Sequence, residues 1–343
     1  MRILTLLILL TLNYLAKAVE PGLQDSARYT GFAVALAWPK VWAKEAGDGY
    51  DRLMRGLGFN DGGFYRVGHA AVVLVNSVDS TCHYYDFGRY HAPVGMGRVR
   101  SANTDHDLAI AIKAELDGKR ILNLDAILCE LQSNASTHAS GPMYASYVRI
   151  NFFKAQQAAN KMQMKELLPY GPFEKGGSNC SRFVRQIILA GEPNWAHALR
   201  LEVVPMLTPS TLYPVSALYH WTKVPSCLDH EAEALKERLS SMPDSLFKDV
   251  LPVPDCPSTV PVEAQWLAGE SSGSWYVLVP KQNEFYMIRF SKTGVQECTV
   301  VLEQIAGEVW DGQGDFEFTY PSNCNSVTLL VNGREIKMHS ISE

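Results

Sequence analysis

The sequence predicts an α+β protein, in which a mixed domain of helices and strands is followed by a small all-β domain. Helical and strand-like apolar patterns alternate up to about residue 225, whereas the pattern beyond residue 263 is strand-like throughout. Prolines that break regular structure cluster between the two regions, at Pro252, Pro254, Pro257 and Pro261. The chain has 343 residues, of which 47% are hydrophobic and 20% charged, so it has enough apolar material for two cores.

The amino terminus predicts export. Arg2 precedes an apolar run over residues 3–15, and residues 16–18 supply the small side chains of a cleavage site. The run is too short for a membrane span, and no later segment reaches the length of one. We therefore expect a periplasmic or secreted protein without a stable membrane anchor. The expected parts are a signal peptide over 1–18, a first domain over 19–226, a helix and proline-rich linker over 227–262, and a β-sandwich or barrel over 263–343.

A cysteine stands at the predicted start of a helix in the first domain. A glycine loop ends at Cys180, and an apolar face with helical spacing follows, until Gly191 provides a stop signal. The unpaired N–H groups and the positive dipole end of a helix N-terminus favour a thiolate over a thiol. The same N–H groups can hold an oxyanion. Cys180 is therefore a candidate nucleophile.

A β-hairpin upstream supplies a candidate base. The β-branched run over 69–76 and the strand over 82–87 are joined by a short polar turn. If Asn76 faces Thr81, then Ala71 lies opposite Asp86, and alternation places His69 and Asp86 on one face. A cysteine, a histidine and a polar group that orients the histidine are the three parts of a thiol-nucleophile site.

Two alternatives accompany this interpretation. A slip of one residue in the hairpin would offer His83 or Tyr85 in place of Asp86 as the third residue. In addition, a lone cysteine is more often a small buried apolar residue than a nucleophile, and a histidine on an apolar strand is often part of the core.

Two motifs carry a resemblance to a known superfamily. The segments Gly68-His-Ala-Ala-Val-Val-Leu-Val75 and Pro169-Tyr-Gly-Pro-Phe-Glu-Lys-Gly-Gly-Ser-Asn-Cys-Ser-Arg-Phe-Val184 resemble those of circularly permuted papain-like (NlpC-like) proteins, which include bacterial cell-wall peptidase relatives and the lecithin:retinol acyltransferase type. The resemblance spans roughly residues 67–191, and the insertion after the hairpin is similar to a bacterial subgroup. It implies that His69 is the base and Cys180 the nucleophile, with Asp86 at the third position. The acyltransferases have a second histidine there, so the chain departs from their pattern.

The combined features predict an exported cysteine hydrolase. Cys180 would attack an amide, in a cell-wall peptide or a similar substrate, to form a thioester, while His69 carries the proton and Asp86 orients His69. One alternative is a lipid or N-acyl amide hydrolase or acyltransferase, which the resemblance and the apolar segment 203–221 suggest. Another is a binding protein of the same fold that has no turnover. The oligomeric state and the exact substrate stay open.

Several other signals are weaker. The segment Gly269-Glu-Ser-Ser-Gly273 matches a serine-hydrolase pattern, but it leads into a strand, so we interpret it as a turn. The scattered His83, His91, His106 and Cys82 lack zinc-site spacing, and we expect no metal and no cofactor. A net charge of −5 without a basic run argues against nucleic acid. Three arginines could bind a substrate anion, or more simply pair with Asp86, Asp105 or Asp107: Arg89, Arg98 and Arg100.

The seven cysteines suit an oxidising compartment, and their odd number leaves Cys180 as the natural unpaired thiol. The expected disulfide pairs are Cys82–Cys129, Cys227–Cys256 and Cys298–Cys324. In the last domain, Asn332-Gly333 is a type I′ hairpin signal. The expected strands are 275–279, 284–290, 295–301, 316–320, 327–331 and 334–341.

Overall fold

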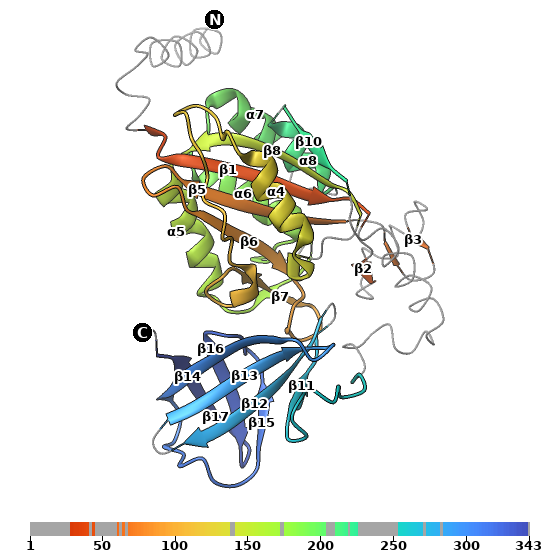
Figure 1. The fold of residues 1–343 in the computed structure, drawn as a ribbon, viewed down its shortest axis with the longest axis vertical. Coiled ribbons are helices and arrows are strands. Elements are labelled where there is room, and N and C mark those ends of the chain that lie inside the picture. The colour runs from red at the N-terminus through yellow and green to blue at the C-terminus, as the bar shows by residue number, and fades with distance from the viewer. Residues whose placement is uncertain are drawn as a thin grey trace, which may run out of the picture.

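A computed structural model gives the arrangement of the chain (Figure 1). The residues that it describes are 28–40, 43–44, 60–61, 64–65, 68–137, 141–171, 175–203, 210–218, 220–225, 253–269, 272–281 and 284–341. The predicted signal peptide, most of the linker and Cys227 lie outside them. The described strands form two sheets of seven strands and one of three. The three-stranded sheet consists of β2 (Ala43–Lys44), β3 (Asn60–Asp61) and β4 (Phe64–Tyr65).

The first large sheet has the order β10-β8-β1-β5-β6-β7-β9, and its described pairs are antiparallel. Its strands are β1 (Gly31–Trp38), β5 (His69–Asn76), β6 (Cys82–Gly88), β7 (Met96–Arg100), β8 (Met143–Ile150), β9 (Leu168–Pro169) and β10 (Thr222–Val224). Every residue of β1 and β5 is buried. Continuous apolar runs of this kind are typical of strands covered on both faces.

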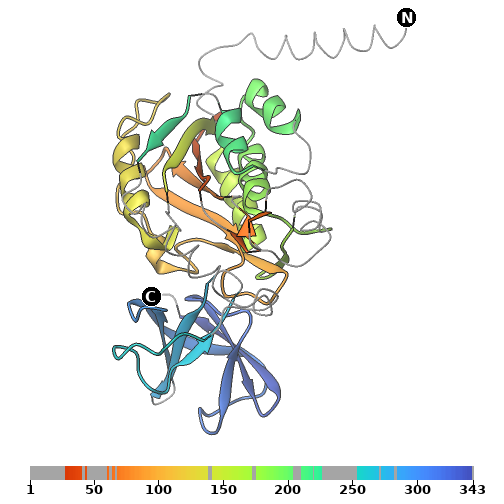
Figure 2. The ribbon, with the colours of Figure 1, turned by 90° about the vertical axis from the view of Figure 1, so that its right-hand side faces the viewer.

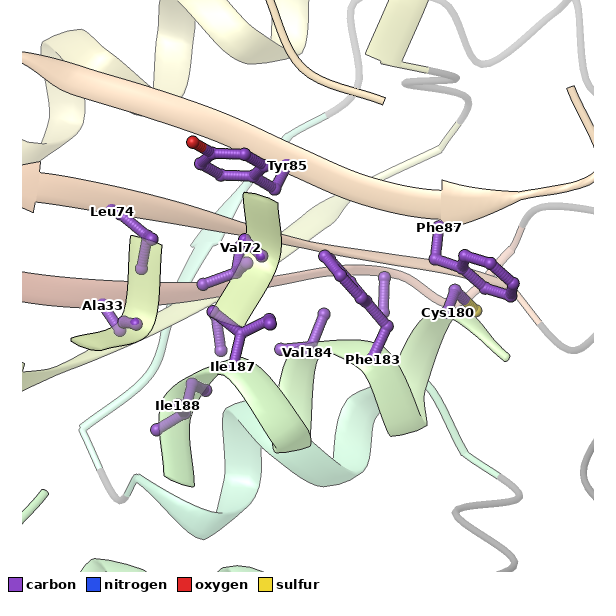
Figure 3. Packing of buried hydrophobic residues seen from close by; sticks show 14 of the residues in the cluster. Ala33, Val72, Leu74, Tyr85, Phe87, Cys180, Phe183, Val184, Ile187 and Ile188 are labelled. Carbon is purple, nitrogen blue, oxygen red and sulfur yellow. The ribbon is translucent and has the colours of Figure 1, made fainter. Parts of the chain in front are cut away.

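Helices cover both faces of this sheet, as the edge-on view in Figure 2 shows. On one face lie α5 (Phe152–Gln163), α6 (Cys180–Ala190), α7 (Trp195–Val203) and α8 (Leu212–Ala217), and on the other lies α4 (Leu124–Ser133). The 3-10 turns η1 (His106–Leu108) and η2 (Ala135–Thr137) lie on the connections. Alternation along β5 sends Val72 and Leu74 to the α6 face, and sends Val73 and Val75 to the α4 face. Figure 3 shows the α6 side of this core.

The second large sheet, of order β11-β12-β13-β14-β17-β16-β15, confirms the expected all-β region. It consists of β11 (Gln265–Leu267), β12 (Ser274–Lys281), β13 (Glu284–Ser291), β14 (Gln296–Ala306), β15 (Phe316–Thr319), β16 (Ser326–Val331) and β17 (Arg334–Ser340). Asn332 and Gly333 both have positive φ, as a type I′ turn requires. The sheet has its own apolar cluster, around Tyr276 and Leu329. The protein is thus an α+β unit followed by a small all-β unit.

The disulfide predictions have mixed outcomes. Cys298 and Cys324 are bonded, as expected. The pairing of Cys82 with Cys129 is wrong: both thiols are free, since Cys82 is buried in the sheet whereas Cys129 is exposed on α4. Residues 127, 128 and 131 form the buried face of α4, and Cys129 therefore points away from the sheet. Cys256 is also free, which overturns its predicted pairing with Cys227.

Within the described part of the chain, no helix is long and apolar enough to cross a membrane.

Gly68, directly before the candidate base, has a conformation that only glycine fits. Its φ is +74°, and an added Cβ would lie 2.5 Å from the Trp38 carbonyl oxygen and 2.7 Å from Thr211 Oγ1. We expect Gly68→Ala to lower the free energy of unfolding by about 2–4 kcal/mol, because positive φ and overlap with backbone add together. Urea unfolding measures the loss.

Gly95→Ala is the matched control for this substitution. Gly95 has a φ of +77°, but no atom lies within 4 Å of its added Cβ. Gly95→Ala should therefore lower the free energy of unfolding only by the conformational strain, about 1 kcal/mol. Equal losses for the two variants would contradict a steric role for the close approach at Gly68.

Candidate active site

Cys180 is the first residue of α6. Asn179 caps the helix: its side-chain Oδ1 accepts the backbone N–H of Arg182 at 2.8 Å. Phe183, Val184, Ile187 and Ile188 point from the helix into the core and fix its position against the sheet (Figure 3). Figure 3 also shows Cys180 at the end of this apolar face, next to Phe87. Helix cap and core thus hold the thiol at the helix N-terminus, with 7% of its surface exposed.

The hairpin of β5 and β6 has the register expected from the sequence. Ala71 faces Asp86, and the Asn76 N–H donates to the Thr81 carbonyl oxygen at 2.9 Å. His69 Nε2 lies 3.0 Å from Asp86 Oδ2, and both side chains are buried. The alternation of strand residues places both on the α4 face of the sheet, at the end where β5 begins.

Asp86 is held by two further side chains. Arg100, opposite Asp86 on β7, donates from Nε to Oδ1 at 3.0 Å and from Nη2 to Oδ2 at 2.6 Å. The Tyr84 hydroxyl donates to Oδ2 at 3.0 Å. Burial alone would raise the pKa of Asp86, but the Arg100 charge and the His69 hydrogen bond outweigh burial and hold the pKa well below its usual range. Asp86 is therefore ionised at neutral pH.

His69 carries a proton up to an unusually high pH. Burial alone would lower its pKa, but hydrogen bonds to Asp86 and to the Cys180 side chain, together with their charges, raise it to about 9. The ring of Trp38 stacks on His69 with centroids 5.9 Å apart. The structure thus brings together the three residues singled out in the sequence: His69 contacts Asp86 on one side and Cys180 on the other.

Two tyrosines at the site, Tyr90 and Tyr170, were not assigned a role from the sequence. The Arg100 guanidinium lies 3.6 Å from the centroid of the Tyr90 ring, and the Tyr90 hydroxyl lies 3.4 Å from the His69 ring nitrogens. Tyr170 stacks on Phe87 with centroids 5.5 Å apart. The pKa of Tyr170 is raised by burial and by the charge of Cys180, whose side chain and backbone both hydrogen-bond its hydroxyl. Tyr170 is close to the proposed nucleophile in the sequence, and this proximity could have identified it as a candidate site residue.

The alternative third residues point elsewhere. His83 Nε2 lies 2.9 Å from Thr81 Oγ1, and Tyr85 donates to Asn160 on α5. Of the three arginines in the insertion, Arg100 pairs with Asp86 and Arg98 with Asp105, which confirms ion pairing for these two. The Arg89 guanidinium lies 5.2 Å from the centroid of the Tyr170 ring. The described residues 212–218 of the apolar segment are largely core, including Val215 and Ala217 on α8.

The raised pKa of His69 predicts a pH-dependent stability. The native state holds a proton that the unfolded state releases near its ordinary value of 6.5, so this stabilisation is complete below about pH 6.5 and is lost as the pH rises through about 9. The loss is on the order of 3 kcal/mol. Urea unfolding at pH 6 and pH 10 measures it, with His69→Ala as the comparison. A variant with the same pH dependence as the parent would contradict the assignment.

Comparisons with known proteins separate the two parts of the chain. Residues 33–196 match the family model described as type VI secretion system effector TseH-like, a segment that contains His69, Asp86 and Cys180. Residues 264–341 match the model described as DUF6695 C-terminal domain. A crystal structure of the type VI secretion system effector TseH is 17% identical, with 55% of this chain and 87% of that chain covered and a TM-score of 0.35. Among curated proteins, none matches.

Proposed function

We propose that this protein is an exported cysteine hydrolase of the permuted papain-like type, in which Cys180 attacks an amide. One observation carries the proposal: a buried chain of contacts runs from Arg100 through Asp86 and His69 to the thiol of Cys180, at a helix N-terminus. A buried ion pair costs free energy of desolvation, so a whole series of such groups is more typical of a reactive site than of a core.

The proposed mechanism follows from the positions of these groups. The Cys180 thiolate attacks the carbonyl carbon, and the backbone N–H of Cys180 at the helix start donates to the oxygen that becomes negative, in exchange for its hydrogen bond to the Tyr170 hydroxyl. The His69 imidazolium gives its proton to the leaving amine, and a thioester with Cys180 remains. Neutral His69 then takes a proton from water, which attacks the thioester and frees the acid and the Cys180 thiolate, so that the starting thiolate and imidazolium are restored. Asp86 keeps the ring oriented through Nε2, so that Nδ1 is the nitrogen that exchanges the proton.

The family match supports the expected export of the protein, and export limits the substrates that it can reach. An effector of a secretion system acts outside the cell that makes it, in accord with the signal peptide predicted over residues 1–18. Its substrate must then be an amide that is reachable in the target cell, and the peptide of a bacterial cell wall fits this requirement. No described feature favours the acyl-amide alternative, because residues 212–218 of the proposed acyl groove are largely in the core.

Parallel digestion tests the function. The purified full chain is incubated with cell-wall peptides and with a panel of N-acyl amides, and the products are identified by mass spectrometry. We expect new amino and carboxyl ends in the wall peptides. Release of fatty acids alone would instead establish the acyl-amide hydrolase, and turnover of neither panel would favour the binding protein without activity.

A further inference from the structure

The all-β unit is joined to the site by a buried set of charges. Arg289 on β13 has 1% of its side chain exposed, and its Nη1 donates to Asp105 Oδ1 at 3.0 Å. Arg289 Nε lies 2.7 Å from Glu297, and Nη2 lies 3.4 Å from Asp107. Asp105 and Asp107 belong to the segment after β7, so this single guanidinium holds carboxylates from both units.

From Asp105, the contacts continue to the strand that orients the candidate base. Arg98 binds both oxygens of Asp105 at 2.7 Å, and its Nε donates to the Tyr90 carbonyl oxygen at 2.9 Å. Arg98 and Arg100 are two residues apart on β7 and therefore point to the same face. Tyr90 in turn lies beneath Arg100 and next to His69. A displacement of Asp105 would therefore reach Asp86 and His69 through one short strand.

A second line of contacts fixes the same segment. Arg98 Nη2 donates to His91 Nδ1 at 3.1 Å, so His91 Nε2 carries the proton and donates to Ser274 Oγ at 2.9 Å. Ser274 donates to Glu297 at 2.9 Å. The backbone of Tyr90 also forms a parallel bridge with Ser272. The Tyr90–His91 turn is thus held between the first unit and the start of β12. Figure 1 shows β7 of the first unit next to the all-β unit.

We propose that Arg289 is a positioning residue for the Cys180–His69 site, so that the all-β unit completes the catalytic unit rather than serving only as a tethered module. This inference rests on the proposed function. Arg289 acts through Asp105, Arg98 and Tyr90, and it does not touch the reacting atoms. Its planar guanidinium reaches three carboxylates in different directions, which a single ammonium group cannot do equally well.

The reactivity of Cys180 toward iodoacetamide tests this inference without a substrate. The alkylation rate of the full chain is measured from pH 5 to pH 10, with Cys180→Ser to subtract other thiols. We expect Arg289→Met to lower the rate at pH 7 by about tenfold, and to move the rise of the rate with pH to higher pH, because Asp86, Arg100 and Tyr90 no longer hold in place the His69 imidazolium that favours the thiolate. Arg289→Lys should lower the alkylation rate by about threefold. It keeps the positive charge, and it is the variant to measure if Arg289→Met does not fold.

Arg334→Met is the matched control, since Arg334 pairs with Glu308 on the exposed surface of the same unit. It should leave rate and pH profile unchanged. Folded Arg289 variants with the parent's rate and profile, whatever their melting temperature, would overturn the inference. A parent protein in which Cys180 shows no reactivity beyond that of an ordinary thiol would instead overturn the proposed function itself.

Discussion

Replacement of Cys180 by serine should abolish turnover, with a loss of about four to six orders of magnitude in kcat. A serine hydroxyl at the helix start has no comparable nucleophilicity, and the imidazolium of His69 is a poor base for it because it already carries the proton. The same change should remove labelling by a thiol-directed probe at pH 6, where ordinary thiols are protonated. Turnover and labelling are measured on the same preparation.

Cys129→Ser is the control for this substitution. Cys129 is an exposed free thiol on α4, so its loss should lower background labelling at high pH and leave turnover unchanged. Cys82 should contribute little to either signal, since burial raises its pKa to about 11. Full turnover in Cys180→Ser would show that another group is the nucleophile.

Removal of the His69 side chain should lower kcat by about two to four orders of magnitude, because the leaving amine then has no proton donor. In the parent, kcat/KM should form a bell-shaped curve whose alkaline limb lies near pH 9, where the imidazolium loses its proton. The limb should disappear in His69→Ala. A pH series of initial rates on both proteins measures these effects.

His83→Ala provides the matched comparison. His83 lies on the neighbouring strand, half-buried against Thr81, and would be the orienting residue if the hairpin were paired one residue out of register. We expect full activity in this variant. If His83→Ala lost activity while His69→Ala kept it, the roles of the two histidines would be reversed.

The local parts of the site were predictable from the sequence. Turn length and alternation predicted the pairing of Ala71 with Asp86 and left a slip of one residue as the alternative, because a hairpin with a short polar turn allows few registers. The start of α6 at Cys180 and its end before Gly191 followed from apolar spacing and a stop signal. The strands β12 to β17 of the all-β unit were predicted because each is apolar and bounded by turn residues, whereas β11, with only three residues, was not predicted.

Contacts between distant segments were not predictable in the same way. The sequence offered three arginines and three aspartates, and only the sheet decides that Arg100 faces Asp86, since β7 pairs with β6. Arg289 lies far along the chain from Asp105, and nothing in local spacing connects them. The central strand β1 could have been recognised as an apolar run of eight residues, but its place between β5 and β8 depends on the complete fold.

The disulfide errors have a similar origin. Pairing by order along the chain assumed that each cysteine is near its sequence neighbour, although disulfide formation depends on the distance and direction of side chains. Cys82 lies on a strand of the sheet, whereas Cys129 lies on the outer side of α4. The order of cysteines along the chain does not contain this information.

The separation of base and nucleophile along the chain has a consequence for when activity arises. His69 belongs to β5 and Cys180 to α6, and their contact requires β5 to be paired in the sheet and α6 to be packed on it. An isolated helix would present a thiol without its proton carrier, and an isolated hairpin would present a histidine without a thiol. On the proposed function, a chain that has not folded would therefore carry no activity in the cell that makes it, and hydrolysis would begin only with the cooperative step that forms the core.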